Sequence, residues 1–122
     1  MEAACQGAHE VGGLTIGVLP GEGAASSPPN PDVDVAIFTG LGEARNWVNV
    51  CSSDALIAVG GGFGTLSEIG AALKARKLLV LVGSWQFEID GTVPQVQRAG
   101  NAGEALALVF AALEARQVQP GG

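Results

Sequence analysis

Short apolar runs alternate with longer amphipathic stretches along this chain. The runs are rich in Val, Ile, Leu and Ala and predict strands over residues 14–20, 35–40, 55–60 and 78–85. Those over residues 14–20 and 55–60 are expected to be buried on both faces. The stretches place apolar residues at helical spacing and predict helices over residues 1–11, 41–54, 65–77 and 101–116. Apolar strands that alternate with helices are typical of an α/β fold, so we expect an open parallel sheet with helices on both faces.

Local signals mark where these elements begin and end. The pair Gly12 and Gly13 predicts that the first helix ends in the left-handed conformation. Asn101 is expected to cap the last helix, with Glu104 three residues later completing a capping-box-like pattern. Residues 21–34 are rich in Pro, Gly and Ser and predict a surface loop rather than a linker. With 122 residues, the chain is expected to form one domain around one core.

Composition excludes several classes of protein. Apolar residues make up 48% of the chain and charged residues 15%, which excludes a disordered chain. No apolar run reaches the roughly 18 residues of a membrane span, so we expect a soluble, cytoplasmic protein with no membrane partner. The net charge is −6, with only six Lys and Arg residues, which argues against a nucleic-acid partner. Small anions can still bind to backbone amides at a helix N-terminus.

The residues that most often bind metals form no metal-site pattern. Cys5 and Cys51 lie in apolar helical patterns without Cys-x-x-Cys spacing, and we expect them to be reduced, buried and inert. His9 is the only histidine and lies on an expected surface helix, with no partner at metal-ligand spacing. The sequence therefore predicts no metal site and no required cofactor.

The stretch SDALIAVGGGFGTLSE, residues 53–68, joins the third expected strand to the third expected helix through four glycines. Glycines let the backbone adopt positive φ and turn N–H groups inward, and the helix start adds unpaired donors. We predict a phosphate-binding loop at the carboxyl end of the strand, where open α/β sheets bind ligands. The alternative is a bare tight turn, in which Thr65 caps the helix and Glu68 reaches back to its backbone.

A resemblance to a known family makes the loop more specific. The loop lacks the Gly-Lys-Ser/Thr of a Walker motif and the acidic residue of a dinucleotide fingerprint. Its residues GGGFGTLSE resemble the signature PGGxGTxxE of the LOG family, the cytokinin-activating phosphoribohydrolases of the SLOG superfamily. Gly60 in the first motif position is similar to the branch that includes molybdenum-cofactor carrier proteins. The resemblance extends over residues 1–21, 39–62 and 65–82 and implies a Rossmann-like fold.

The resemblance to the LOG enzymes also implies a catalytic pair. Arg45 stands fifteen residues before Gly60, the interval that the family's catalytic arginine keeps, and Glu68 takes the place of the catalytic glutamate. Asn46 replaces the family's lysine, and Ser67 replaces the glutamate that precedes the catalytic one. The positions that the resemblance assigns to phosphate or nucleotide binding are Gly60, Gly61, Gly62, Phe63, Gly64, Thr65, Leu66, Ser67 and Asn46.

The chemistry of N-glycosidic cleavage suits both members of the pair. The reaction passes through an oxocarbenium-like state, which a carboxylate stabilises or assists by activating water. A guanidinium holds a phosphate or a leaving group in bidentate geometry. From spacing alone, Arg45 has the alternative of a solvated helix position paired with Glu43.

These residues leave three functional hypotheses. The first is an enzyme that hydrolyses a nucleoside 5′-monophosphate, such as AMP, to free base and ribose 5-phosphate. The second is a non-catalytic carrier of the molybdenum cofactor (molybdopterin) or of a nucleotide, in which Asn46 and Ser67 mark lost chemistry. The third is a truncated, inactive product. The resemblance also implies a homo-oligomer, most simply a dimer.

The resemblance further implies that a segment is missing before residue 1. The family's fold begins with a strand, a helix and a second strand whose end aligns with Met1, so residues 1–122 are expected to form one LOG-like nucleotide-binding domain that is incomplete at its N-terminus. Loss of a central strand leaves unpaired backbone groups on two neighbours, and each buried unsatisfied group costs about 1–3 kcal/mol. We therefore expect a marginally stable fold unless the sheet closes differently or with a partner.

Other residues are weaker candidates for a ligand site. Trp47 and Trp85 could flank a planar ligand, although Trp47 shares the apolar stripe of its helix and fits the core or an interface equally well. Ser84 follows a strand end and could approach a ligand. Asp32 and Asp34 lie in the Pro-rich loop, and we expect them only to solvate it.

Overall fold

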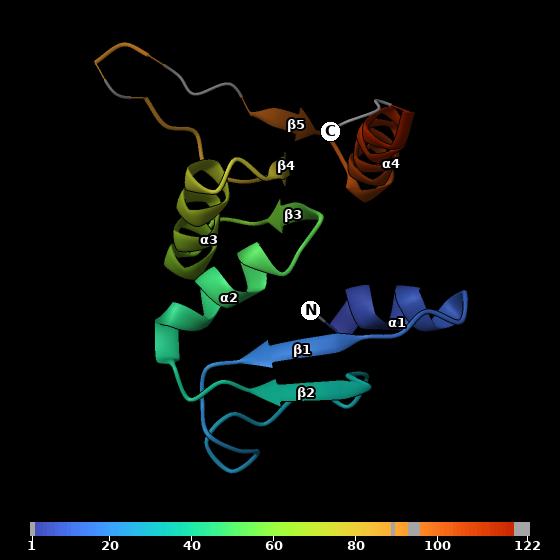
Figure 1. The fold of residues 1–122 in the computed structure, drawn as a ribbon, viewed down its shortest axis with the longest axis vertical. Helices are drawn as coiled ribbons and strands as arrows, with labels where there is room; N and C mark the ends of the chain where they lie inside the picture. Colours follow the sequence, from blue (N-terminus) through green and yellow to red (C-terminus); the bar gives the residue numbers. More distant parts are fainter. Residues whose placement is uncertain (1, 89, 93–95, 119–122) are drawn as a thin grey trace. The chain divides into compact units, whose positions relative to one another are not determined.

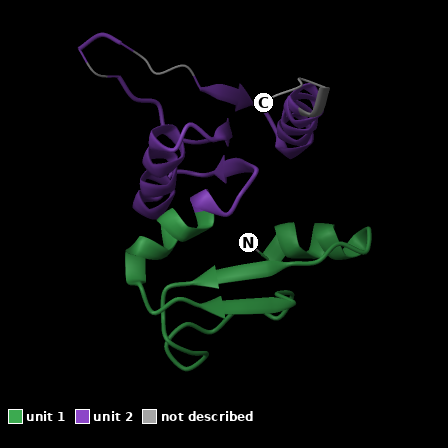
Figure 2. Cartoon of the chain, in the orientation of Figure 1, with its two compact units in different colours: residues 1–49 green, residues 50–122 purple. Residues whose placement is uncertain are grey.

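The computed structural model describes residues 2–88, 90–92 and 96–118, and the chain forms two compact units, residues 1–49 and 50–122 (Figure 2). Each unit has its own parallel sheet. The elements in chain order (Figure 1) are α1 (Glu2–Glu10), β1 (Ile16–Leu19), β2 (Val35–Phe38), the short 3-10 helix η1 (Gly42–Ala44), α2 (Arg45–Cys51), β3 (Ala55–Val59), α3 (Phe63–Lys74), β4 (Leu78–Val82), β5 (Gln97–Ala99) and α4 (Ala102–Val118).

In the first unit, β1 and β2 form a parallel pair. Ile16 lies opposite Val35, and Leu19 lies opposite Phe38. The Pro-rich segment connects the two strands as an irregular loop, as the sequence predicts. The pair therefore has the parallel arrangement expected of an α/β fold.

Helix α1 ends as its glycine pair predicts. Gly12 has a left-handed φ of +75°, and the N–H of Gly13 donates to the backbone oxygen of Ala8 at 2.8 Å. Glycine commonly closes a helix in this way because it adopts positive φ without strain. The predicted end of the first helix is confirmed.

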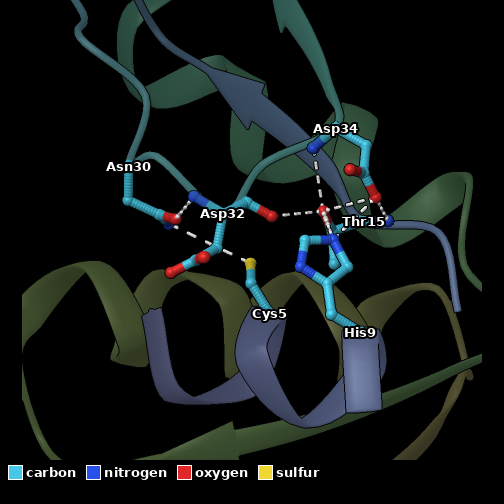
Figure 3. A network of polar contacts seen from close by, with 6 residues as sticks. All are labelled: Cys5, His9, Thr15, Asn30, Asp32 and Asp34. Atoms are coloured by element: carbon cyan, nitrogen blue, oxygen red, sulfur yellow. Dashed lines mark hydrogen bonds and ion pairs between the residues drawn. The ribbon is translucent and has the colours of Figure 1, made fainter. Parts of the chain in front are cut away.

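A polar network joins α1, the residue before β1 and the loop before β2 (Figure 3). The carboxylate of Asp34 accepts the backbone N–H of Thr15 at 2.9 Å and lies 2.8 Å from Nε2 of His9. The N–H of Asp34 donates to the hydroxyl oxygen of Thr15 at 2.8 Å, and that hydroxyl donates to the backbone oxygen of Asp32 at 2.6 Å. Asp34 thus links three segments of the first unit.

The expectation that Asp32 and Asp34 only solvate their loop is therefore wrong. The loop returns against α1 and the start of β1, so both carboxylates find hydrogen-bond donors there, and Gln6 donates to Asp32 at 3.2 Å. The backbone N–H of Thr15 holds the pKa of Asp34 below its ordinary value, and the contact with His9 lowers that pKa further.

In the second unit, β3, β4 and β5 form a parallel sheet in that order (Figure 1). Ala55 lies opposite Leu78, Val59 lies opposite Val82, and Val82 lies opposite Ala99. Because the three strands run in the same direction, their carboxyl ends meet at one edge of the sheet. The loops after β3 and β4 both start at this edge.

Helices α3 and α4 cover opposite faces of this sheet (Figure 1). Successive side chains of β4 point to opposite faces, so each helix contacts alternate residues of that strand. The buried side chains are Val50, Ala58, Ile69, Ala72, Leu79 and Leu81 on the α3 side, and Val80, Ala105 and Val109 on the α4 side. The predicted layering of helix, sheet and helix is thus present in the second unit.

The start of α4 has the predicted cap. Oδ1 of Asn101 accepts the N–H of Glu104 at 2.9 Å, and the Glu104 carboxylate accepts the N–H of Gly100 at 2.7 Å. Two donors at the helix start are satisfied in this way. The glutamate reaches one residue further back than in the usual capping box.

The expectation that β1 and β3 are buried on both faces is wrong, and β2 is partly exposed as well. Ile16 of β1 is 56% exposed, Val35 of β2 is exposed, and Val59 of β3 is 66% exposed. The reason is that each of these strands has a single neighbouring strand among the described residues and so forms a sheet edge. Strand β4, which lies between two strands, is the most buried of the four expected strands.

The helix expected over residues 41–54 is shorter than predicted, and its apolar stripe is not buried. Trp47 and Val48 of α2 are exposed, whereas Asn46 and Val50 are buried. The stripe residues Trp47, Val48 and Cys51 all lie within α2, and the helix face that they share is exposed, whereas the face that carries Asn46 and Val50 is buried.

Candidate phosphate-binding site

The glycine loop follows β3 directly and leads into α3. Gly60 has a left-handed φ of +85°, and its N–H donates to the backbone oxygen of Val82 at 3.2 Å. Gly62 then takes the N-cap position with an extended backbone, and Phe63 is the first helical residue. The turn at residue 60 requires glycine because other residues adopt this φ only with strain.

The start of α3 leaves backbone donors available to an anion. The first N–H groups of any helix lack intrahelical partners, and the N-cap residue Gly62 has no side chain with which to cap them. Gly61, Gly62 and Gly64 are exposed, and a Cβ added at Gly62 or Gly64 would meet no atom within 4 Å. The helix start is therefore open to solvent and suited to a phosphate.

Helix α3 begins two residues earlier than the sequence predicts, which changes the role of Thr65. The N–H of Leu66 donates to the backbone oxygen of Gly62 at 3.0 Å, so the first turn closes around Thr65 rather than after it. Thr65 is the third helical residue and not the N-cap, so the alternative of a Thr65–Glu68 capping box is wrong. Glu68 lies in the second turn and is half-buried.

Two aromatic rings lie beside the glycine loop. Phe63 and Trp85 stack with ring centroids 5.9 Å apart and planes 25° apart. Nε1 of Trp85 donates to the backbone oxygen of Gly62 at 3.1 Å, and a guanidinium nitrogen of Arg98 donates to the backbone oxygen of Trp85 at 2.7 Å. These contacts tie the loop after β4 to the N-cap of α3.

A cavity of about 400 Å³ opens in the segment that follows Trp85. Its described lining residues are Gln86, Phe87, Glu88 and Arg98. The hydroxyl oxygen of Ser84, at the start of the same segment, is buried and has no hydrogen-bond partner among the described residues. The sequence did not single out Arg98, because the short strand that carries it lies in a polar stretch where no strand was predicted.

Arg45 and Asn46 lie in the first unit, at the start of α2. A guanidinium nitrogen of Arg45 donates to the backbone oxygen of Val18 at 2.9 Å. Asn46 is buried, and its Nδ2 lies 3.4 Å from the carboxylate of Glu43. Since Glu68 belongs to the second unit, its pairing with Arg45 stays a prediction.

The remaining candidates form no metal site. Residues 2–88, 90–92 and 96–118 contain no group of three or more His, Cys, Asp or Glu that could hold a metal ion. Cys5 and Cys51 are free. Cys51 is exposed at the end of the short α2 and Cys5 is only half-buried, so the expected burial of both is wrong. No helix in the described part of the chain is long and apolar enough to cross a membrane.

Comparison with known protein families identifies the family of this chain. Residues 1–110 match the model of the SLOG cluster4 family. The chain belongs to the SLOG cluster4 family. The resemblance to the SLOG superfamily, carried in the sequence by the GGGFGTLSE motif, is thereby confirmed.

Solved structures with the same fold include two proteins that handle the molybdenum cofactor. The molybdenum cofactor binding protein from the phototrophic bacterium Rippkaea orientalis is 38% identical, with a TM-score of 0.77. The molybdenum cofactor carrier protein from Chlamydomonas reinhardtii is 41% identical, with a TM-score of 0.76. Each comparison covers 93% of this chain and 71% of the other chain, so this SLOG cluster4 chain shares their Rossmann-like α/β fold and is shorter.

A curated relative occurs in Archaeoglobus fulgidus. This uncharacterized protein is 49% identical to the SLOG cluster4 chain over 77 residues. The match covers 63% of this chain and 49% of the relative. The chain thus spans about half the length of the curated relative that it matches.

Proposed function

We propose that this chain binds the molybdenum cofactor, or a related phosphorylated pterin, at the glycine loop before α3. The observation that carries the proposal is the 38% and 41% identity, over 93% of the chain, to proteins that bind or carry that cofactor. The cofactor is cargo in this proposal, and the chain needs no catalytic group to hold it.

The geometry of the loop supports an anionic group on the ligand. Gly62 places the uncapped N-terminus of α3 at the carboxyl edge of the sheet, and the positive φ of Gly60 lets the chain turn there. Backbone N–H groups and the helix dipole stabilise a phosphate without a nearby lysine. That matters in a chain whose net charge is −6, because binding does not depend on a basic surface.

The test is whether the pterin and the metal accompany the protein. The full chain is purified from cells that make the molybdenum cofactor, and molybdenum is measured by mass spectrometry while the released pterin is oxidised and quantified by fluorescence. We expect both in a constant ratio to protein. Gly62→Val should lose both, because a branched side chain at the N-cap crowds the anion, whereas Gly70→Ala, on the exposed side of the same helix, should retain them. Absence of pterin and molybdenum from the unmodified chain contradicts the proposal.

A second candidate function is hydrolysis of nucleoside 5′-monophosphates. It is supported by Glu68, which stands in the motif position of the LOG glutamate and lies one turn beyond the open N-terminus of α3. Glu68 would act as the carboxylate catalyst, and Arg45 would orient the phosphate or the leaving group. Incubation with AMP and chromatography for adenine test it, with Glu68→Gln as the control. If the unmodified chain releases adenine no faster than the Glu68→Gln control, the hydrolase function is ruled out.

We also propose that the chain forms a homodimer. Leu106 and Phe110 of α4 are exposed one helical turn apart, and exposed apolar patches often mark protein interfaces. Light scattering across a range of protein concentrations measures the mass in solution. A constant monomer mass rules the dimer out.

A further inference from the structure

Phe63 is an aromatic side chain held in solvent beside the glycine loop. As the first residue of α3 it is 83% exposed, so its ring adds little to the hydrophobic core. The ring is nevertheless positioned, because it stacks on Trp85 with a centroid distance of 5.9 Å. Stacking on Trp85 uses one face of the ring and leaves the other face to solvent.

Trp85 is itself fixed at two points. Its indole Nε1 donates to the backbone oxygen of Gly62, the N-cap of α3, at 3.1 Å, and its backbone oxygen accepts from Arg98 at 2.7 Å. A Cβ built on Gly61 would lie 4.0 Å from Nε1 of Trp85, so the loop passes the indole without a clash. The aromatic pair is therefore anchored to the same residue that begins the proposed anion site.

We propose that Phe63 and Trp85 form a stacking platform, and that the ligand of the glycine loop is a phosphate ester of a planar aromatic heterocycle. This inference rests on the proposed function and deepens it by naming the side chains that hold the ring of the ligand. A phosphate at the N-terminus of α3 brings its organic part next to residue 63. Heterocycles stack on aromatic side chains regardless of their hydrogen-bonding pattern, so the platform stabilises a bound pterin or purine. A sugar phosphate has no aromatic ring and gains no stacking energy there.

The test compares ligands that share the phosphate and differ in the ring. A pterin monophosphate, AMP and ribose 5-phosphate are titrated into the full chain carrying Trp47→Phe, in which Trp85 is the remaining tryptophan. Calorimetry gives the affinities, and fluorescence reports on Trp85. We expect at least one heterocyclic phosphate to bind about fivefold or more tighter than ribose 5-phosphate and to quench Trp85. The preference between AMP and the pterin identifies the heterocycle.

Variants separate stacking from support of the loop. Phe63→Ala should reduce the affinity for the heterocyclic phosphate to that for ribose 5-phosphate and leave the latter unchanged, while Phe63→Tyr should retain the difference. Val11→Ala removes another exposed apolar side chain, 85% exposed in the first unit, and should change neither affinity.

Four results overturn the platform. Equal affinities for all three ligands refute stacking while the phosphate site survives, whereas no binding of any phosphate refutes the proposed function as well. Loss of ribose 5-phosphate affinity in Phe63→Ala shows that the ring supports the loop instead of stacking on the ligand. A change of oligomeric mass in Phe63→Ala, with unchanged ligand preference, assigns the ring to an interface with a second copy.

Discussion

The guanidinium of Arg45 donates a hydrogen bond from Nη1 to the backbone oxygen of Val18, 2.9 Å away. The bond joins the start of α2 to β1 within the first unit. The Nε of Arg45 is buried and has no hydrogen-bond partner among the described residues. A residue that the motif spacing assigns to a ligand therefore also holds two elements of the fold together, so loss of activity on mutation would not by itself prove a catalytic role.

Replacement of Arg45 by Ala should destabilise the first unit. A hydrogen bond from a charged donor contributes about 1.5–3 kcal/mol, so we expect the free energy of unfolding to fall by roughly that amount. Urea denaturation measures the change through the fluorescence of Trp47, which lies in the first unit, in a chain that carries Trp85→Phe. Arg45→Lys, which keeps the charge but not the planar fork, should recover part of the loss. Equal stability of Arg45→Ala and the parent would mean that the contact to Val18 contributes nothing.

Two glycines of α3 allow stability to be separated from binding. Alanine at Gly64 or Gly70 meets no atom within 4 Å and should stabilise the helix by about 0.5–1 kcal/mol in each case. Gly64, however, lies in the first turn, where a methyl group narrows access to the backbone donors. Loss of one charged hydrogen bond there weakens binding by about tenfold or more.

For each variant, calorimetry with AMP gives the binding affinity and thermal unfolding gives the stability. Gly64→Ala should thus be more stable than the parent and bind AMP less tightly, while Gly70→Ala should be more stable with unchanged affinity. If Gly64→Ala binds as well as the parent, the anion does not sit on the first turn of α3.

The sequence predicted the parts of the fold that depend on neighbours along the chain. The glycine pair that closes α1 and the Asn101 cap of α4 were both predicted correctly, because capping involves residues only a few positions apart. Strand β5 was missed, since Gln97 and Arg98 are polar and only pairing with β4 makes their segment a strand. Edge positions were missed for the same reason: the apolar pattern of β3 does not say how many strands flank it.

The candidate site was predicted to a similar extent. The motif located the glycine loop and its strand end correctly, because both follow from local sequence. The N-cap was placed three residues too late, at Thr65 instead of Gly62, since a glycine caps without the side-chain oxygen by which caps are recognised. The contacts of Trp85 with Gly62 and Arg98 join residues 23 and 13 positions apart and could not be read from spacing.

The cap of α4 should contribute measurably to the second unit. Asn101→Ala removes the acceptor of the Glu104 N–H, and loss of such a cap costs about 1 kcal/mol. Urea denaturation followed by Trp85, in a chain that carries Trp47→Phe, measures it. Asn101→Asp keeps an oxygen acceptor and should be close to the parent in stability. An equal loss of stability in Asn101→Ala and Asn101→Asp would show that the NH2 part of the Asn101 amide, and not its oxygen, stabilises the helix start.

The network around Asp34 should make the first unit sensitive to acid. The N–H of Thr15 and, after it, the contact with His9 hold the pKa of Asp34 below its ordinary value. The folded chain therefore binds a proton at Asp34 less readily than the unfolded chain. It follows that the stabilising contribution of the carboxylate is complete above about pH 4 and is lost as the pH falls from there through the lowered folded pKa.

The predicted loss of stability at low pH is tested by urea denaturation at about six pH values between pH 2.5 and pH 7, followed by the fluorescence of Trp47. Asp34→Asn should be less stable than the parent at pH 7, and its stability should fall less steeply on acidification because the group that titrates is gone. Asp32→Asn is the matched control: the Asp32 side chain accepts one exposed hydrogen bond from Gln6, so its removal should change the acid limb less. His9→Gln should weaken the acid dependence in part, since the Thr15 N–H remains. An acid limb as steep in Asp34→Asn as in the parent would place the sensitivity at another carboxylate and leave the Asp34 contact without influence on folding.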